Sequence, residues 1–157
     1  MNIRTPSDPH CFAKKTIFLA GTTDLKISGN WQEWLAQHLQ YLDVDILNPR
    51  LNNWFSKNEQ NLNNQAFTSQ LSWELEGLEN ADLVVMYFKA QSTSPTTLIE
   101  FGLTAKSGRL VVCCEKGFWQ YGNVEFICHQ CHVPMVESFP ELLEIVEEKV
   151  AKNETIK

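Results

Sequence analysis

Long apolar runs are missing from this sequence, which has no stretch of about 18 or more consecutive apolar residues. We therefore expect no transmembrane helix and no membrane partner. The first residues, MNIRTPSDPHCFAK, also lack the apolar centre of a secretion signal, because Pro, Asp and His stand in its place. We expect residues 1–14 to form a flexible leader and the protein to be cytoplasmic.

Basic residues are outnumbered by acidic ones. Lys and Arg number 13 against 19 Asp and Glu, which gives a formal net charge of -6. Proteins that bind nucleic-acid backbones carry a basic stripe or patch, and this composition supplies none, so we expect no nucleic-acid partner. A local cationic pocket for one small anion stays compatible with these numbers.

The number of cysteines is odd, so they cannot all pair in disulfides within the chain. Five of them, in a chain without an export signal, fit reduced thiols better than a disulfide framework. The motif CHQCH, from Cys128 to His132, matches the CxxCH pattern of c-type haem attachment and contains three potential zinc ligands. Because no export address and no second cysteine pair accompany it, we favour a helix end followed by a turn into a strand. We expect no metal and no organic cofactor.

Apolar and amphipathic segments alternate along the chain. Strands are expected at KTIFLAG, LDVDILNP, DLVVMYF, RLVVCCE and VPMV, with amphipathic helices between and after them. This order predicts an α/β, doubly wound fold of the flavodoxin or Rossmann type, with five parallel strands and helices on both faces. The length suits one domain, which we place at 15–150, followed by a loose C-terminal tail at 151–157.

Polar residues follow the ends of the expected strands, where ligands bind in doubly wound sheets. They are Thr22, Thr23 and Asp24 after the first strand, Asn48 and Arg50 after the second, 89–94 after the third and 115–119 after the fourth. Asp82 precedes the third strand at the opposite edge of the sheet, so we expect it to serve a turn or a cap.

Two acids lie where apolar residues are expected. Glu100 is part of the apolar helical segment SPTTLIEFGLTA, and Glu74 lies inside the apolar stripe that contains Leu71 and Leu78. Buried carboxylates usually have a partner or a use. A pair of them performs nucleophilic and acid–base work at sugar carbons, roughly 5 Å apart when one is the nucleophile. The alternative is that each meets a buried Arg or a backbone amide.

Four segments together resemble a known family. IFLAGTTD, NPR, QLSWELEGLENADLVVMYF and SPTTLIEFGLTA, in this order and spacing, resemble the nucleoside 2-deoxyribosyltransferases, and most closely the branch called nucleoside 2-deoxyribosyltransferase-like. The resemblance covers roughly residues 15–136. It implies that Glu100, followed by Phe101 and Gly102, attacks the anomeric carbon. It also implies that Glu74, where many members have Asp, positions the nucleophile or handles protons.

Ser94 departs from the transferase pattern in a way that favours a phosphorylated substrate or simple hydrolysis over base exchange on a free nucleoside. Family transferases have an acid at this place to bind the base, whereas related N-glycosidases of deoxynucleoside 5'-monophosphates have a serine that contacts phosphate. Ser94 and Thr97 would lie at a helix N-terminus, which attracts anions, although Ser94 could also be a plain N-cap. Arg50 could pair with a phosphate or with a buried acid.

Further residues have weaker interpretations. Gly21 and Thr22 would bring backbone close to a sugar, and Asp24 would bind a sugar hydroxyl or cap a loop. Asn123 would reach a neighbouring subunit's pocket, because the resemblance implies a homo-oligomer whose subunits complete each other's sites. Aromatic residues that could stack on a base, or belong to the core, are Trp54, Phe118, Trp119 and Tyr121.

The expected function is an enzyme that cleaves or exchanges the N-glycosidic bond of a 2'-deoxynucleoside or its 5'-monophosphate through a covalent glycosyl-glutamate intermediate. The same fold also hosts proteins without catalysis, so the alternative is a nucleotide-binding or sensing module.

Overall fold

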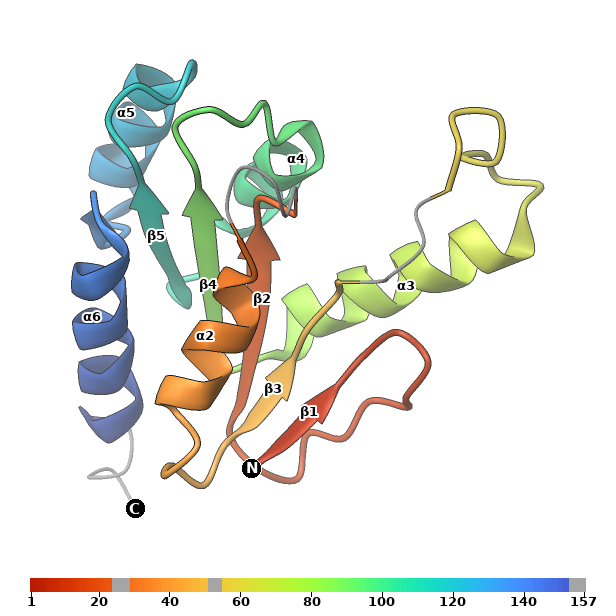
Figure 1. Cartoon of the computed structure of the whole chain (residues 1–157), viewed down its shortest axis with the longest axis horizontal. Coiled ribbons are helices and arrows are strands. Elements are labelled where there is room, and N and C mark those ends of the chain that lie inside the picture. The colour runs from red at the N-terminus through yellow and green to blue at the C-terminus, as the bar shows by residue number, and fades with distance from the viewer. Residues whose placement is uncertain (24–28, 51–54, 153–157) are drawn as a thin grey trace.

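The computed structural model describes residues 1–23, 29–50 and 55–152, which form an α/β fold around one parallel sheet (Figure 1). The strands are β1 (Asn2–Arg4), β2 (Thr16–Gly21), β3 (Asp45–Leu47), β4 (Leu83–Phe88), β5 (Leu110–Cys114) and β6 (Met135–Val136). The helices are α2 (Trp31–His38), α3 (Gln65–Asn80), α4 (Pro95–Thr104), α5 (Tyr121–Cys131) and α6 (Phe139–Lys152).

The sheet has six strands in the order β1-β3-β2-β4-β5-β6, and every neighbouring pair is parallel. Our expectation of five strands was therefore one short. The additional strand is β1, from the segment that we expected to be a flexible leader. Its residues pair with β3, and Asn2 N–H donates to Asp45 Oδ1 at 3.0 Å. An edge strand of three residues with a single apolar side chain is too short for an apolar pattern to reveal it in the sequence.

Helices cover both faces of the sheet, as the alternating sequence predicts. On one face, α3, α4 and α5 bury side chains such as Trp73, Phe101 and Val124. On the other face, α2 and α6 bury Trp31 and Leu142 among others. The central strand β4 is buried along its whole length, as a continuous apolar run requires when both faces are covered.

The chain changes direction between β2 and β4. It leaves β2 toward β3 on one side and then crosses over to β4 on the other, so the carboxyl ends of β2 and β4 flank the topological switch point. Gly21, the last residue of β2, has φ +143, and a Cβ there would lie 2.5 Å from Tyr87 O. Glycine is therefore required for β2 to approach β4 closely at this point.

The other local expectations have clear outcomes. CHQCH is a helix end: α5 stops at Cys131 and His132 adopts a left-handed conformation at φ 56. Asp82 lies at the edge opposite the strands' carboxyl ends, and its Oδ2 accepts a hydrogen bond from Thr16 N–H at 2.8 Å, so it links the starts of β2 and β4 where we expected a turn or a cap. Across the described ranges, no helix is long and apolar enough to cross a membrane. Residues 153–157 of the expected tail lie outside the described residues, whereas Ala151 and Lys152 end α6.

Candidate active site

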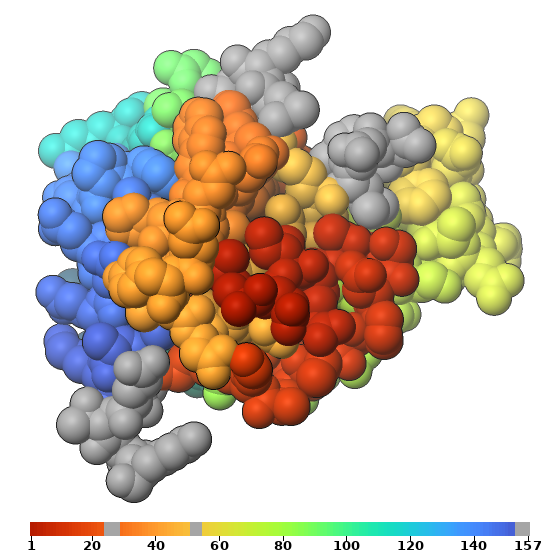
Figure 2. All heavy atoms as spheres, turned by 60° about the horizontal axis from the view of Figure 1, so that its bottom comes forward, coloured from red at the N-terminus to blue at the C-terminus, as the bar shows by residue number. Residues whose placement is uncertain are grey.

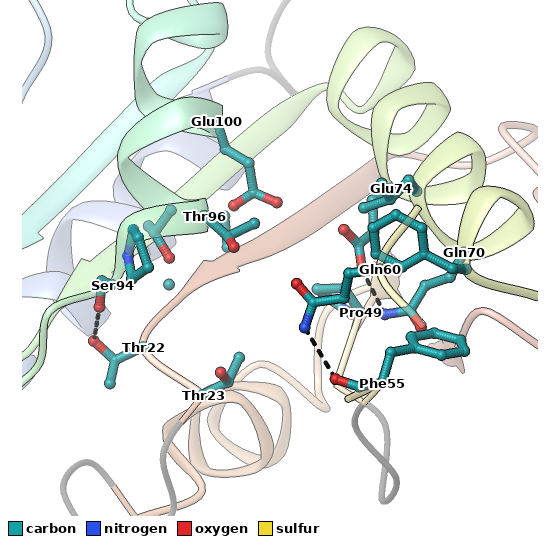
Figure 3. Close-up of a pocket in the computed structure, with 16 residues that line it drawn as sticks. Thr22, Thr23, Pro49, Phe55, Gln60, Gln70, Glu74, Ser94, Thr96 and Glu100 are labelled. Atoms are coloured by element: carbon teal, nitrogen blue, oxygen red, sulfur yellow. Dashed lines mark hydrogen bonds between the residues drawn. The ribbon is translucent and has the colours of Figure 1, made fainter. Parts of the chain in front are cut away.

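A pocket of about 180 Å³ opens at the switch point, between α3 and the amino-terminal end of α4 (Figure 3). Its floor comes from the end of β2 and its walls come from the two helices and from residues that follow β3. The described residues that line it are Ala20, Gly21, Thr22, Thr23, Pro49, Phe55, Gln60, Phe67, Gln70, Leu71, Glu74, Ser94, Pro95, Thr96, Thr97 and Glu100.

Glu100 enters this pocket from the second turn of α4. Burial, and then the charge of Glu74, raise the pKa of Glu100 from its ordinary 4.5 to about 8. Within the described residues, its carboxylate receives no hydrogen bond and has no cationic partner. Its position depends on the helix itself, where Thr104 Oγ1–H donates to Glu100 O at 2.7 Å.

Glu74 faces the same space from α3, and Figure 3 shows the two carboxylates directed into the pocket from opposite walls. Its side chain is 8% exposed, and burial raises its pKa. Gln70, one helical turn earlier, donates from Nε2 to Glu74 Oε1 at 2.8 Å and partly offsets that rise. Because like charges in one pocket disfavour double ionisation, the pair holds a proton more tightly than either acid would alone.

The pocket wall at α4 is rich in hydroxyls. The Oγ1 of Thr22 lies 2.9 Å from Ser92 Oγ and 2.8 Å from Ser94 Oγ, and the two serine hydroxyls are 2.8 Å apart. Lys89 N–H donates to Thr22 Oγ1 at 3.1 Å, and Trp31 Nε1–H donates to Thr22 O at 2.8 Å. This triangle of hydroxyls ties the end of β2 to the loop that leads into α4.

Ser94 differs from a plain N-cap. Its side chain makes no capping hydrogen bond, and its backbone is left-handed at φ 42. A non-glycine residue pays roughly 1–2 kcal/mol for that conformation, and the hydroxyl triangle holds it in place. Thr97, three residues on, is 4% exposed and also lines the pocket. Ser94 therefore directs its hydroxyl toward Thr22 instead of toward the helix backbone.

The aromatic residues of the pocket are not the ones that the sequence suggested. Phe55 and Phe67 line it and meet edge to face, with ring centroids 5.5 Å apart. Phe118 is buried in the core, and Trp119 Nε1–H donates to Thr93 O away from the pocket lining. Phe55 follows the long loop after β3, so only the tertiary structure brings it to the site. Trp54 lies outside the described residues.

Two other candidates, Arg50 and Asn123, are not among the described residues that line the pocket. Arg50 donates from Nη2 to Thr23 O at 3.1 Å, so it braces backbone near the pocket and is not itself among the described lining residues. Asn123 is exposed in the first turn of α5 and does not reach the pocket of its own chain. Its predicted contact with a neighbouring subunit stays a prediction. Asp24 lies outside the described residues.

Sequence reasoning singled out none of three polar residues at the site, which are Gln60, Gln70 and Ser92. Ser92 completes the hydroxyl triangle, and it belongs to a run of hydroxyl residues in which we gave a role only to Ser94 and Thr97. Gln70 lies four residues before Glu74, the helical spacing at which side chains meet, and this spacing is visible in the sequence. No group of three or more His, Cys, Asp or Glu side chains in the described ranges is arranged to hold a metal ion.

Comparisons with known proteins bear on the fold and on the family of this chain. The fold is similar to the crystal structure of a conserved protein from Enterococcus faecalis, with a TM-score of 0.57 and 15% identity over 90% of this chain and 99% of that chain. At this identity the likeness shows the fold. Comparison with curated proteins gives no match. A family model described as nucleoside 2-deoxyribosyltransferase like matches residues 14–118, a range that includes both pocket carboxylates. The chain therefore belongs to the nucleoside 2-deoxyribosyltransferase-like family.

Proposed function

We propose that the protein cleaves or exchanges the N-glycosidic bond of a 2'-deoxynucleoside or its 5'-monophosphate through a covalent ester on Glu100. The observation that carries the proposal is the carboxylate pair: Glu100 and Glu74 face one pocket from two helices, and none of the described lining residues is a cation that would neutralise them. A structural role for buried acids normally includes such a partner. Membership of the family supports the same chemistry.

In the first step, the pair supplies both a nucleophile and a proton. Near neutral pH the two acids share one proton, because their pKa values are raised by burial and Glu74's charge raises that of Glu100 further. The Glu100 carboxylate attacks C1' while the bond from C1' to the base nitrogen breaks, and the shared proton passes through Glu74 to the leaving base. The products of this step are the free base and a glycosyl-Glu100 ester.

In the second step, an acceptor attacks C1' and releases Glu100 as a carboxylate. If the acceptor is a base, its N–H proton returns to the pair and the reaction is a transfer. If the acceptor is water, one of its protons returns and the reaction is hydrolysis. Phe55 and Phe67 offer an apolar wall for a planar base, and the hydroxyl triangle offers donors and acceptors for the sugar.

The charge of the pocket favours the free nucleoside over the monophosphate. Two unit charges 4 Å apart interact by roughly 1 kcal/mol in water and about 4 kcal/mol near a protein surface. A helix N-terminus returns only about 0.3–1 kcal/mol to an anion. The repulsion between a dianionic phosphate and an ionised Glu74 or Glu100 therefore exceeds the stabilisation that the N-terminus of α4 provides. This repulsion disappears only when both acids are protonated.

The test is chromatography after incubation with deoxynucleosides and their 5'-monophosphates, with and without an acceptor base. We expect base release or exchange from wild type, and a loss on the order of 1000-fold or more in Glu100→Gln. Glu79→Gln, which changes an exposed acid on the same helix as Glu74, is the matched control and should react like wild type. Wild-type turnover in Glu100→Gln would contradict the covalent mechanism. Saturable binding of an unaltered nucleoside by wild type would favour the non-catalytic alternative.

A further inference from the structure

Helix α3 carries Glu74 and Gln70 into the pocket, yet only part of it packs closely on the sheet. Near its carboxyl end, Gly77 lies against β2 so tightly that a Cβ would come within 2.6 Å of the Phe18 ring. Its amino-terminal half extends beyond the sheet edge in Figure 1, and Gln65 and Ala66 are exposed. The turn that carries Glu74 lies between the anchored end and this projecting end. Its Trp73 ring meets the Phe18 ring of β2 with centroids 6.2 Å apart, and the other side of the Trp73 ring needs support from another part of the chain.

That support comes from the N-terminal segment. Trp73 Nε1–H donates to Asp8 O at 2.9 Å, and His10 Nε2–H donates to Trp73 O at 2.8 Å. The His10 ring stacks on the Trp73 ring with centroids 4.6 Å apart, and Phe12 stacks on the outer side of His10. The His10 side chain is only 6% exposed. Figure 2 shows the N-terminal residues in red lying alongside the yellow-green atoms of α3.

The other end of the segment is tied to the sheet. β1 pairs with β3, Asn2 N–H donates to Asp45 Oδ1 at 3.0 Å, and Arg4 Nη2 lies 3.8 Å from Asp45 Oδ2. Between these two anchors, Asp8 Oδ2 accepts from Thr5 N–H at 2.8 Å and shapes the turn. Residues 2–12 thus connect the edge of the sheet to the middle of α3. The match to the family model begins at residue 14, so this connection lies outside the matched region.

Trp73 and Glu74 are consecutive residues of one helix, so their side chains point about 100° apart around its axis. Fixing Trp73 on the side of the N-terminal segment fixes the rotation of α3, and with it the direction of Glu74. A misplacement of about 1 Å in a catalytic group can cost on the order of 100-fold in rate. We propose that residues 2–12 form a clasp that positions Glu74 against Glu100, with His10 as its main positioning residue.

The test is the His10→Ala variant, in which we measure the steady-state kinetics and the pKa of Glu100. Where the proposed glycosidic reaction holds, we expect kcat to fall roughly 10-fold or more while KM changes less than about threefold, because substrate contacts stay in place. Independently of turnover, displacement of Glu74 should move the pKa of Glu100 down by about 0.5–1, as read by carboxyl NMR. Glu74 and Glu100 are the titratable side chains among the described lining residues, so this titration reports their separation.

Two further variants make the outcome decisive. His129→Ala changes an exposed histidine on α5 and should alter neither reading. His10→Gln keeps an N–H donor for Trp73 O without the ring stack, should fold if His10→Ala does not, and should give an intermediate result. An unchanged kcat and an unchanged Glu100 titration in a folded His10 variant would overturn the clasp. If neither wild type nor any variant turns over a nucleoside, but the His10 variants still change the pKa of Glu100, the proposed function fails and the clasp stands.

Discussion

Replacing Glu100 by Gln should change the pH dependence of stability, whatever the reaction. The pKa of Glu100 is 4.5 in an ordinary exposed state and about 8 in the folded protein, because of burial and the charge of Glu74. The folded state therefore holds the proton more tightly than the unfolded state. Between pH 4.5 and 8, the stability contributed by the protonated acid is lost as pH rises, and above about pH 8 the loss is complete.

The size of this loss follows from the same pKa values. Each pKa unit corresponds to about 1.4 kcal/mol, so the rise to about 8 sets an upper limit of about 5 kcal/mol. Glu100 is partly exposed, and water screening and small relaxations reduce the effect. We therefore expect about 2 kcal/mol. Gln has nearly the same shape and no charge, so the variant should not show this loss.

Urea unfolding at pH 5 and pH 9 measures the difference directly. The free energy of unfolding of Glu100→Gln, relative to wild type, should be higher by about 2 kcal/mol at pH 9 than at pH 5. Glu79→Gln supplies the control, because its side chain is exposed and should give the same difference from wild type at both pH values. If the relative stability of Glu100→Gln changed by less than about 0.5 kcal/mol between the two pH values, the burial of an uncompensated Glu100 would be refuted.

Three further results are expected. Glu74→Gln removes the group that passes the proton to the base, so turnover should fall. It also removes the charge that adds to burial in raising the pKa of Glu100, so the remaining activity should rise with pH at more acidic values; an unmoved profile would show that the acids do not interact. Gly21→Ala should cost about 2 kcal/mol or more in urea unfolding, because its Cβ would lie 2.5 Å from Tyr87 O, whereas Gly122→Ala, with open space around it, should not destabilise. The kcat/KM for a deoxynucleoside should exceed that for its 5'-monophosphate, and the reverse order would contradict the charge argument.

The sequence predicts the parts of this site that follow from periodicity and strand order. Glu100 could be placed because it interrupts an apolar helix that starts after a central strand, and Glu74 because it interrupts an apolar stripe. Both predictions concern local patterns with fixed spacing. Even Gln70 was accessible in this way, since it lies one turn before Glu74.

The parts that could not be predicted depend on contacts between distant segments. β1 has three residues, Asn2–Arg4, whose only signal is their pairing with β3, and His10 meets Trp73 across 63 positions of the chain. Phe55 reaches the pocket from a long loop, whose residues follow neither the helical nor the strand spacing of apolar side chains. Ser94 precedes a proline, where extended backbone is the usual expectation, and its left-handed conformation comes from hydroxyls supplied by other elements.

Two destabilising features lie close together in and before α4, and their proximity strengthens the assignment of the site. Ser94 has a left-handed backbone at the start of the helix, and Glu100 has a buried, uncompensated carboxylate two turns later. Either feature alone could be a tolerated irregularity. A sequence that violates local preferences twice around one pocket is using stability for another purpose. Replacing Glu100 by Gln should therefore stabilise the protein at alkaline pH and abolish the proposed turnover together, as a trade between stability and function requires.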